Sequence, residues 1–146
     1  MKIHLRIDQT YTRPEIHLCA PSKTEEVQEL HDFLLRALSG EMTLFTDYGA
    51  ERVLLEAVIC FYAQGQKVCA RTTTQTYTVR QRLYELEESL PPSDFIRISN
   101  SEIVNIHKIR RLDTSLTGTI RMQLAGDVET YVSRRYVTKI KKSLGL

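Results

Sequence analysis

The sequence predicts a mainly β protein of the α+β class with short helices, preceded by a small strand–strand–helix extension at the N-terminus. From about residue 41 onward, runs with alternating apolar and polar side chains are separated by short turns, which is typical of antiparallel strands. Before that point, two short alternating runs precede one long stretch with helical periodicity. Hydrophobic residues make up 42% of the 146 residues and charged residues 26%, so we expect a soluble chain with a buried core.

The N-terminal extension is expected to contain two strands and one helix. Residues 2–8 and 15–20 place Ile or Leu at alternate positions, which predicts strands. Ser22 is the expected N-cap of the helix and Glu25 its capping-box partner, and Gly40 suits the left-handed end of the helix. The apolar stripe of this helix consists of Val27, Leu30, Phe33, Leu34, Ala37 and Leu38.

A domain boundary is expected at the stretch YGAER, residues 48–52. The extension then covers residues 1–49, and a second domain covers residues 50–146. The apolar stripe of the helix can bury within the same chain or against a second subunit. The expected role of residues 1–49 is therefore packing, dimerisation or a regulatory contact.

Strands are expected on both sides of this boundary. Residues 42–46 predict a short strand, and residues 53–64 a central strand, either continuous or broken by a bend. Gly65 and Gln66 mark a tight turn, and residues 67–79 are rich in Val, Thr and Tyr. A hairpin across Gly65 is the natural interpretation.

The remaining chain is expected to alternate short helices and strands. Thr78 is the expected N-cap of a short helix, with Gln81 at the capping-box position, and Pro91 ends this helix. A last helix is expected at residues 134–144, with Ser133 as its N-cap. Strands are expected at residues 95–105, 108–113, 119–125 and 128–133.

Charge is unevenly distributed along the chain. Residues 1–49 hold five Lys and Arg against eight Asp and Glu, whereas residues 95–146 hold ten against four. A local basic excess of this kind is typical of a surface that faces a polyanion. Charge scattered for solubility is the alternative explanation.

Residues that catalysis or metal binding requires are sparse. Cys19, Cys60 and Cys69 are widely spaced among apolar residues, as reduced core thiols are. The four histidines do not stand at metal-ligand spacing. Only His17 lies near a cysteine, and two ordinary strand residues explain that pair better than a metal site. We expect no enzymatic activity, no cofactor, no metal and no small-molecule substrate.

The sequence favours a cytoplasmic protein. No run approaches the roughly 18 to 20 apolar residues of a membrane span. The first residues, MKIHLRID, carry charges where a signal peptide has its apolar core.

Polar side chains gather at three strand ends and turns in the second domain. Asn and Gln can bond adenine, Arg can bond guanine, and Ser and Lys suit phosphate. Polar turns and a simple N-cap role for Ser133 are the alternative interpretation. The candidate DNA-binding residues are Gln66 and Lys67 in the first set, Arg97, Asn100 and Ser101 in the second, and Ser133, Arg134 and Arg135 in the third.

Two of these segments resemble a known family. FIRISNSEIVNIHKIRRLD and VETYVSRRYVTKIKKSL, at this separation, are similar to the signature of the LytTR-type DNA-binding domain of bacterial transcription regulators. The resemblance covers roughly residues 50–146. It implies an elongated, mostly β fold in which loops, rather than a recognition helix, enter successive major grooves of double-stranded DNA.

Carried over by position, the resemblance assigns DNA contacts to the three sets. Gln66 or Lys67 would contact DNA from the first hairpin, and Asn100 from the second segment with Ser101 beside it. Ser133 and Arg135 would contact DNA from the last loop, with Arg134 next to them. Asn105 also matches the pattern, either as a turn-forming residue or as a contact. The base preference does not transfer, because Ser99 stands where many members have His and Asn100 where they have a basic residue.

The resemblance also suggests how the protein is regulated. Residues 1–49 are too short for a phosphorylatable receiver domain, so the chain resembles a short stand-alone subclass of LytTR regulators. In that subclass a small membrane protein is often the antagonist. The expected function is a sequence-specific transcription regulator that acts as a homodimer. The alternative is a protein-interaction module that binds an acidic or membrane-protein partner.

Overall fold

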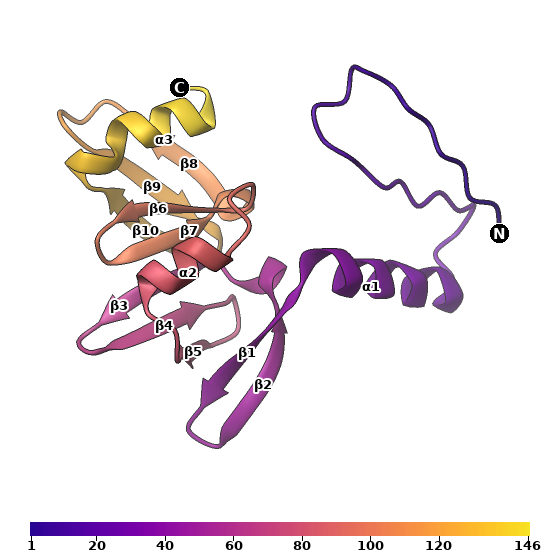
Figure 1. Ribbon diagram of the computed structural model, residues 1–146, viewed down its shortest axis with the longest axis horizontal. Helices are drawn as coiled ribbons and strands as arrows, with labels where there is room; N and C mark the ends of the chain where they lie inside the picture. Colours follow the sequence, from indigo (N-terminus) through magenta and orange to yellow (C-terminus); the bar gives the residue numbers. More distant parts are fainter. The chain divides into compact units, whose positions relative to one another are not determined.

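The structure is a computed structural model that describes the backbone of residues 1–146 and the side chains of all residues except Arg36 and Ser39. The chain divides into two compact units, Met1–Ala37 and Leu38–Leu146 (Figure 1).

The first unit consists of an extended segment followed by most of helix α1 (Glu25–Ser39). The helix that the sequence predicts is confirmed, but the prediction of Ser22 as its N-cap is wrong. Thr24 caps the helix instead, because its Oγ1 accepts a hydrogen bond of 3.3 Å from the backbone N–H of Val27.

The two strands predicted at residues 2–8 and 15–20 are not formed, so that part of the prediction is wrong. Ile3, Leu5 and Ile7 are 93%, 88% and 87% exposed. A strand is stabilised when a neighbouring strand takes its backbone hydrogen bonds and when one of its faces is buried. In the described chain no strand pairs with either segment, so the alternating pattern alone does not produce a sheet.

The second unit contains two antiparallel sheets and two short helices, α2 (Leu83–Ser89) and α3 (Val137–Leu144). The larger sheet has the strand order β2-β1-β5-β4-β3-β7-β6, and the smaller has the order β10-β9-β8. The mainly β class with short helices is therefore confirmed. The strands of the larger sheet are β1 (Glu41–Thr46), β2 (Gly49–Leu54), β3 (Cys60–Gln64), β4 (Lys67–Arg71), β5 (Thr76–Val79), β6 (Phe95–Ser99) and β7 (Glu102–Asn105). Those of the smaller sheet are β8 (Ile109–Asp113), β9 (Ile120–Leu124) and β10 (Val128–Val132).

Strand β1 lies in the predicted extension but belongs to the larger sheet. It pairs with β2 along its whole length and with β5 at Phe45 and Thr78. The sheet therefore begins before residue 49, where the sequence alone suggests a boundary.

Three predicted strands are each divided in two. A 3₁₀ turn at Leu55–Ala57 separates β2 from β3. The side chain of Thr72 closes the turn between β4 and β5, because its Oγ1 accepts the backbone N–H of Gln75 at 3.2 Å. The turn at Asn100 and Ser101 separates β6 from β7. In this order, the three turns divide the strands predicted at residues 53–64, 67–79 and 95–105.

Helix α2 begins later than the sequence suggests. Thr78, the predicted N-cap, lies in β5 and pairs with Cys69 of β4. The helix starts only at Leu83, where the Glu85 side chain accepts the backbone N–H of Arg82 at 3.4 Å. Pairing with a neighbouring strand therefore overrides the local capping signal.

Strand β3 contributes to two separate cores, because successive side chains of a strand point to opposite faces. On one face Phe61 is buried with Leu86 of α2. On the other face Cys60 is buried with Met122 of the smaller sheet and Ile140 of α3. The second core joins the two sheets and α3, and so fixes the loops at their ends. None of the helices in the described chain has the length and apolar character needed to cross a membrane.

Candidate nucleic-acid interface

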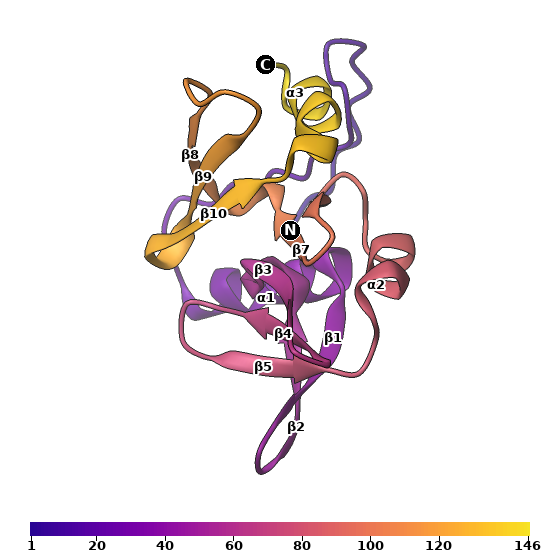
Figure 2. The same cartoon turned by 90° about the vertical axis from the view of Figure 1, so that its left-hand side faces the viewer.

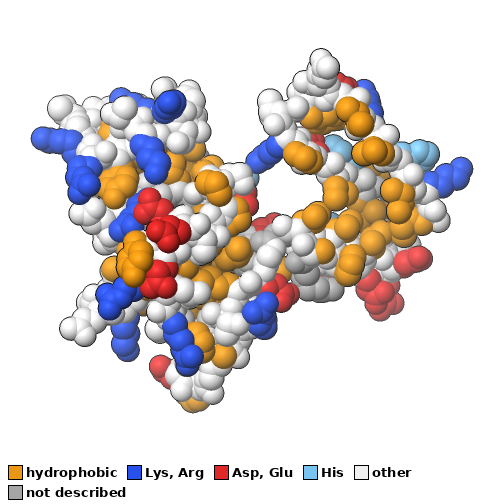
Figure 3. Space-filling view, viewed as in Figure 1, with side chains coloured by type: hydrophobic (Ala, Val, Ile, Leu, Met, Phe, Trp, Pro, Cys, Tyr) orange, Lys and Arg blue, Asp and Glu red, His pale blue; other side chains and the backbone are white. Residues whose placement is uncertain are grey.

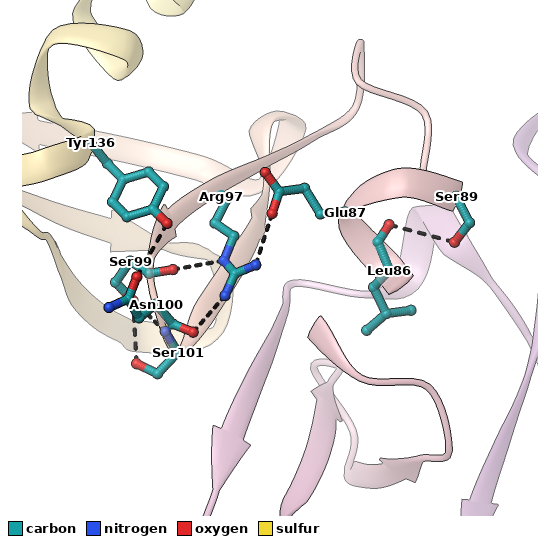
Figure 4. A network of polar contacts seen from close by, with 8 residues as sticks. All are labelled: Leu86, Glu87, Ser89, Arg97, Ser99, Asn100, Ser101 and Tyr136. Atoms are coloured by element: carbon teal, nitrogen blue, oxygen red, sulfur yellow. Dashed lines mark hydrogen bonds and ion pairs between the residues drawn. The ribbon is translucent and has the colours of Figure 1, made fainter. Parts of the chain in front are cut away.

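Arg97 of β6 holds the turn between β6 and β7 in place. Its Nε donates to the carbonyl of Ser99 at 2.9 Å, and its Nη2 donates to the carbonyl of Asn100 at 2.7 Å. Its Nη1 forms an ion pair of 2.8 Å with Glu87 of α2 (Figure 4). Only 13% of the Arg97 side chain is exposed. The guanidinium is thus engaged within the protein, which is the arrangement of a support and not of a free DNA contact.

The link between β10 and α3 lies beside this turn. The backbone N–H of Ser133 donates to the carbonyl of Ile98 at 2.9 Å. The Tyr136 hydroxyl donates to Oδ1 of Asn100 at 3.3 Å (Figure 4). These bonds place Asn100 next to the segment that contains Ser133, although the two are far apart in the sequence.

The β3–β4 hairpin borders the same turn. The backbone N–H of Ala63 donates to the carbonyl of Ser101 at 2.8 Å. Gly65 has a φ of 62°, a conformation that glycine adopts without strain, and it allows the tight turn that the sequence predicts. Gln66 and Lys67, both exposed, lie at the hairpin tip, where Lys67 pairs with Gln64, the residue that follows Ala63.

The two arginines of the last segment are exposed. The guanidinium of Arg135 lies 5.9 Å from the centroid of the Tyr136 ring. Arg134 lies against the turn before β9, where a Cβ built on Gly118 would stand 3.1 Å from its Nε. Among the described side chains, neither arginine forms an ion pair. Both positive charges are therefore available to an external anion.

Asn105 is a structural residue. It is only 2% exposed, its Nδ2 donates to the carbonyl of Val58 at 2.9 Å, and its Oδ1 accepts the N–H of His107 at 3.0 Å. Of the two interpretations that the sequence left open, the structure favours the turn-forming one, because no part of this amide reaches the surface.

A groove of about 250 Å³ lies beside the turn, lined in part by Ser101, Arg71, Glu102 and Thr130. The hydroxyl of Thr130 donates to the carboxylate of Glu102, and burial raises the pKa of Glu102. Burial also raises the pKa of Cys60 to about 12. The thiol of Cys60 therefore stays protonated and unreactive at neutral pH.

Sequence reasoning missed three side chains that shape this site, Glu87, Glu102 and Tyr136. Tyr136 is part of the SRRY segment that carries the resemblance, so of the three residues only Tyr136 is marked by the sequence as a member of the site. Glu87 and Glu102 act through contacts with distant parts of the chain, and nothing in their neighbouring residues marks them.

One edge of the second unit gathers the predicted residues. Asn100, Ser101 and Ser133 are adjacent, the hairpin tip borders them, and Arg134 and Arg135 follow directly. Figure 2 turns this edge toward the reader, and Figure 3 shows many Lys and Arg side chains along that side of the unit, with a group of acidic side chains among them. We call the three segments, residues 64–67, 99–101 and 133–136, the basic edge. Exposed amides, hydroxyls and guanidinium groups on a basic edge are typical of a nucleic-acid-binding domain.

Comparison with known proteins leads to the same class. The model of the LytTr DNA-binding domain family matches residues 49–145. An uncharacterized HTH-type transcriptional regulator of Staphylococcus aureus (strain COL) is 37% identical over 148 residues, covering 100% of this chain and 99% of that protein. A regulator of the same description from strain MRSA252 is 36% identical over the same length. The solved LytTr DNA-binding domain of a Bacillus cereus protein matches with a TM-score of 0.70 and 28% identity, covering 73% of this chain and 97% of that one.

The chain belongs to the LytTr DNA-binding domain family. It is a DNA-binding regulator of transcription and not an enzyme, as the sequence predicts. The family match begins at residue 49, and the residues before it contain helix α1 and strand β1. The resemblance noted in the sequence is therefore confirmed.

Proposed function

We propose that the second unit reads DNA sequence by inserting the three segments of the basic edge into the major groove. The observation that carries the proposal is the contact between Asn100 and Tyr136, which joins two of these segments into one surface. The helices of the second unit have seven and eight residues and are separated by five strands. This arrangement favours loops over a helix-turn-helix pair as the reading elements.

The chemistry of each segment suggests a division of roles. The Asn100 amide accepts the Tyr136 proton at Oδ1, which leaves its Nδ2 to donate to an acceptor on a purine or thymine edge. Arg135 has the planar fork that binds guanine O6 and N7 in a bidentate manner. Gln66 would contact a base, whereas Lys67, Ser101, Ser133 and Arg134 would hold phosphates. Arg97 would support this surface by its hydrogen bonds to the turn at Asn100 and would not contact DNA itself.

We also infer that the protein is cytoplasmic and acts as a homodimer through the N-terminal extension. Ile3, Leu5 and Ile7 alternate with polar or charged residues along the N-terminal segment and are almost fully exposed. Phe33 and Leu38 of α1 are 59% and 64% exposed. A two-fold dimer would bind half-sites about 10 base pairs apart. Control by a small membrane-protein antagonist would use the same extension.

The test is binding to a duplex that the purified protein selects from random sequences. Fluorescence anisotropy compares this duplex with a scrambled one at about 50 and 200 mM salt. We expect the selected duplex to bind more tightly at both salt concentrations, with both affinities falling steeply as salt increases. Failure to select any sequence, or equal affinity for both duplexes, would instead support the protein-interaction module.

A further inference from the structure

We propose that Glu87 of helix α2 is a positioning residue for DNA recognition, which acts through Arg97 on the direction of the Asn100 side chain. This inference rests on the proposed function. Glu87 itself is not part of the basic edge, and it contacts that edge only through the guanidinium of Arg97 (Figure 4).

Arg97 binds both peptide groups that flank the Cα atom of Asn100. The carbonyl of Ser99 belongs to the peptide before Asn100, and the carbonyl of Asn100 belongs to the peptide after it. Arg97 donates to the first at 2.9 Å and to the second at 2.7 Å. Since two fixed peptide planes determine φ and ψ of the residue between them, the guanidinium sets the direction in which the Cα–Cβ bond of Asn100 leaves the backbone, from which its side chain extends.

Glu87 fixes the guanidinium in turn. It takes the remaining terminal nitrogen, Nη1, at 2.8 Å, so all three nitrogens of the planar group have different partners. A planar group held at three points keeps a single orientation. Removal of the carboxylate releases one of these points and lets the group rotate about its bonds to the two carbonyls.

Helix α2 gives Glu87 a rigid base. The neighbouring residue, Leu86, is fully buried in the first core, and Leu83 is 7% exposed. Glu88 is the next residue, and it is exposed. Glu88 therefore carries the same charge on the same short helix without the contact to Arg97, since that guanidinium is bound to Glu87.

Charge and positioning predict opposite effects for the loss of Glu87. A carboxylate near DNA repels phosphate, so its removal strengthens binding to every sequence if charge alone acts. If Glu87 positions Asn100, its removal weakens binding to the selected duplex, while binding to scrambled DNA is unchanged or slightly tighter. The sign of the change on the selected duplex separates the two effects.

The experiment compares Glu87→Gln with Glu88→Gln, which removes the same charge. Affinities for the selected and the scrambled duplex are measured by anisotropy in the full-length chain. For Glu87→Gln we expect about a tenfold loss on the selected duplex only, in line with a weakened charged hydrogen bond. Glu88→Gln should bind both duplexes as tightly as the unmodified chain or slightly more tightly. Equal behaviour of the two variants on the selected duplex would overturn the proposal.

A second variant distinguishes positioning from loss of folding. Arg97→Lys keeps the positive charge but cannot reach both carbonyls and Glu87 at once. We expect Arg97→Lys to reduce selectivity, and Glu87→Gln to cause no further loss when combined with it, because both changes act on the same contact. In two-dimensional NMR spectra, Glu87→Gln should shift the Asn100 amide signals while the core signals stay in place. Fully additive losses, or unshifted Asn100 signals, would also overturn the proposal.

These outcomes are distinct from failure of the proposed function. If the unmodified chain does not select any DNA sequence, the proposed function itself fails. If the unmodified chain is selective and Glu87→Gln behaves as Glu88→Gln does, only the role of Glu87 fails.

Discussion

The hydroxyl of Thr130 on β10 donates to the carboxylate of Glu102 on β7, and this bond joins the smaller sheet to the larger one. Glu102 directly follows the Asn100–Ser101 turn, and β10 leads directly into Ser133. The bond therefore lies at the base of two segments of the basic edge. The carboxylate is largely desolvated there, which raises its pKa.

Glu102 should make the stability of the protein depend on pH. A raised pKa in the folded state means that the folded protein binds this proton more tightly than the unfolded chain does. The contribution of Glu102 is therefore fully present below the unfolded pKa and is lost as pH rises through the folded pKa. We expect Glu102→Gln to unfold at a higher urea concentration than the unmodified chain at pH 7, and the advantage to shrink at lower pH. If the difference in urea midpoint between the two proteins stayed the same from pH 7 to lower pH, the raised pKa of Glu102 would be contradicted.

Asn105 should matter for stability and not for recognition. Asn105→Ala leaves the carbonyl of Val58 and the N–H of His107 without their partner. We expect a loss of about 2 kcal/mol in the free energy of unfolding, measured by urea denaturation. The folded fraction should keep its preference for the selected duplex over the scrambled one. A loss of this preference at unchanged stability would return Asn105 to the candidate contacts.

Arg135 and Arg134 are neighbours with different proposed roles, so the alanine substitution of each serves as the control for the other. Arg135→Ala should cost about 1–3 kcal/mol on the selected duplex and reduce selectivity, because a bidentate contact to guanine depends on sequence. Arg134→Ala should weaken binding to all duplexes alike and lower the salt dependence by about one phosphate contact. Anisotropy salt titrations on both duplexes provide the check. Identical profiles for the two variants would reject this division of roles.

The extension should control the oligomeric state. Phe33 is 59% exposed in α1, so Phe33→Glu adds a charge without disturbing a core. We expect sedimentation equilibrium to show a dimer for the unmodified chain and a monomer for Phe33→Glu, with unchanged circular dichroism. A monomeric unmodified chain, or a dimer that persists in the variant, would reject the proposed interface.

Local patterns predicted those parts of the fold that depend on near neighbours. The hairpin across Gly65 and the helix before Gly40 follow from turn chemistry and periodicity, and both are formed. The capping pattern that predicts a helix at Thr78 is local, whereas the strand pairing of Thr78 with Cys69 is not. The segments at residues 2–8 and 15–20 have the pattern of strands but lack a partner in the described chain.

The candidate site was predictable in its composition but not in its support. Asn100 and Ser133 could be singled out as polar residues at turns, and the structure places their segments side by side. The role of Arg97 depends on Glu87, which lies on a different element. The structural role of Asn105 depends on its hydrogen bond to Val58, which is 47 residues away in the sequence. Such roles arise from tertiary contacts that no local spacing encodes.

Methylation interference on the selected duplex tests the central claim most directly. Dimethyl sulfate modifies guanine at N7, which faces the major groove, and adenine at N3, which faces the minor groove. If the basic edge reads the major groove, bound DNA will be depleted of molecules methylated at guanine N7 within the site, and adenine N3 methylation will be tolerated. Arg135→Ala should remove the interference at one guanine in each half-site. Depletion at adenine N3 alone, with guanine N7 methylation tolerated throughout the site, would contradict major-groove reading.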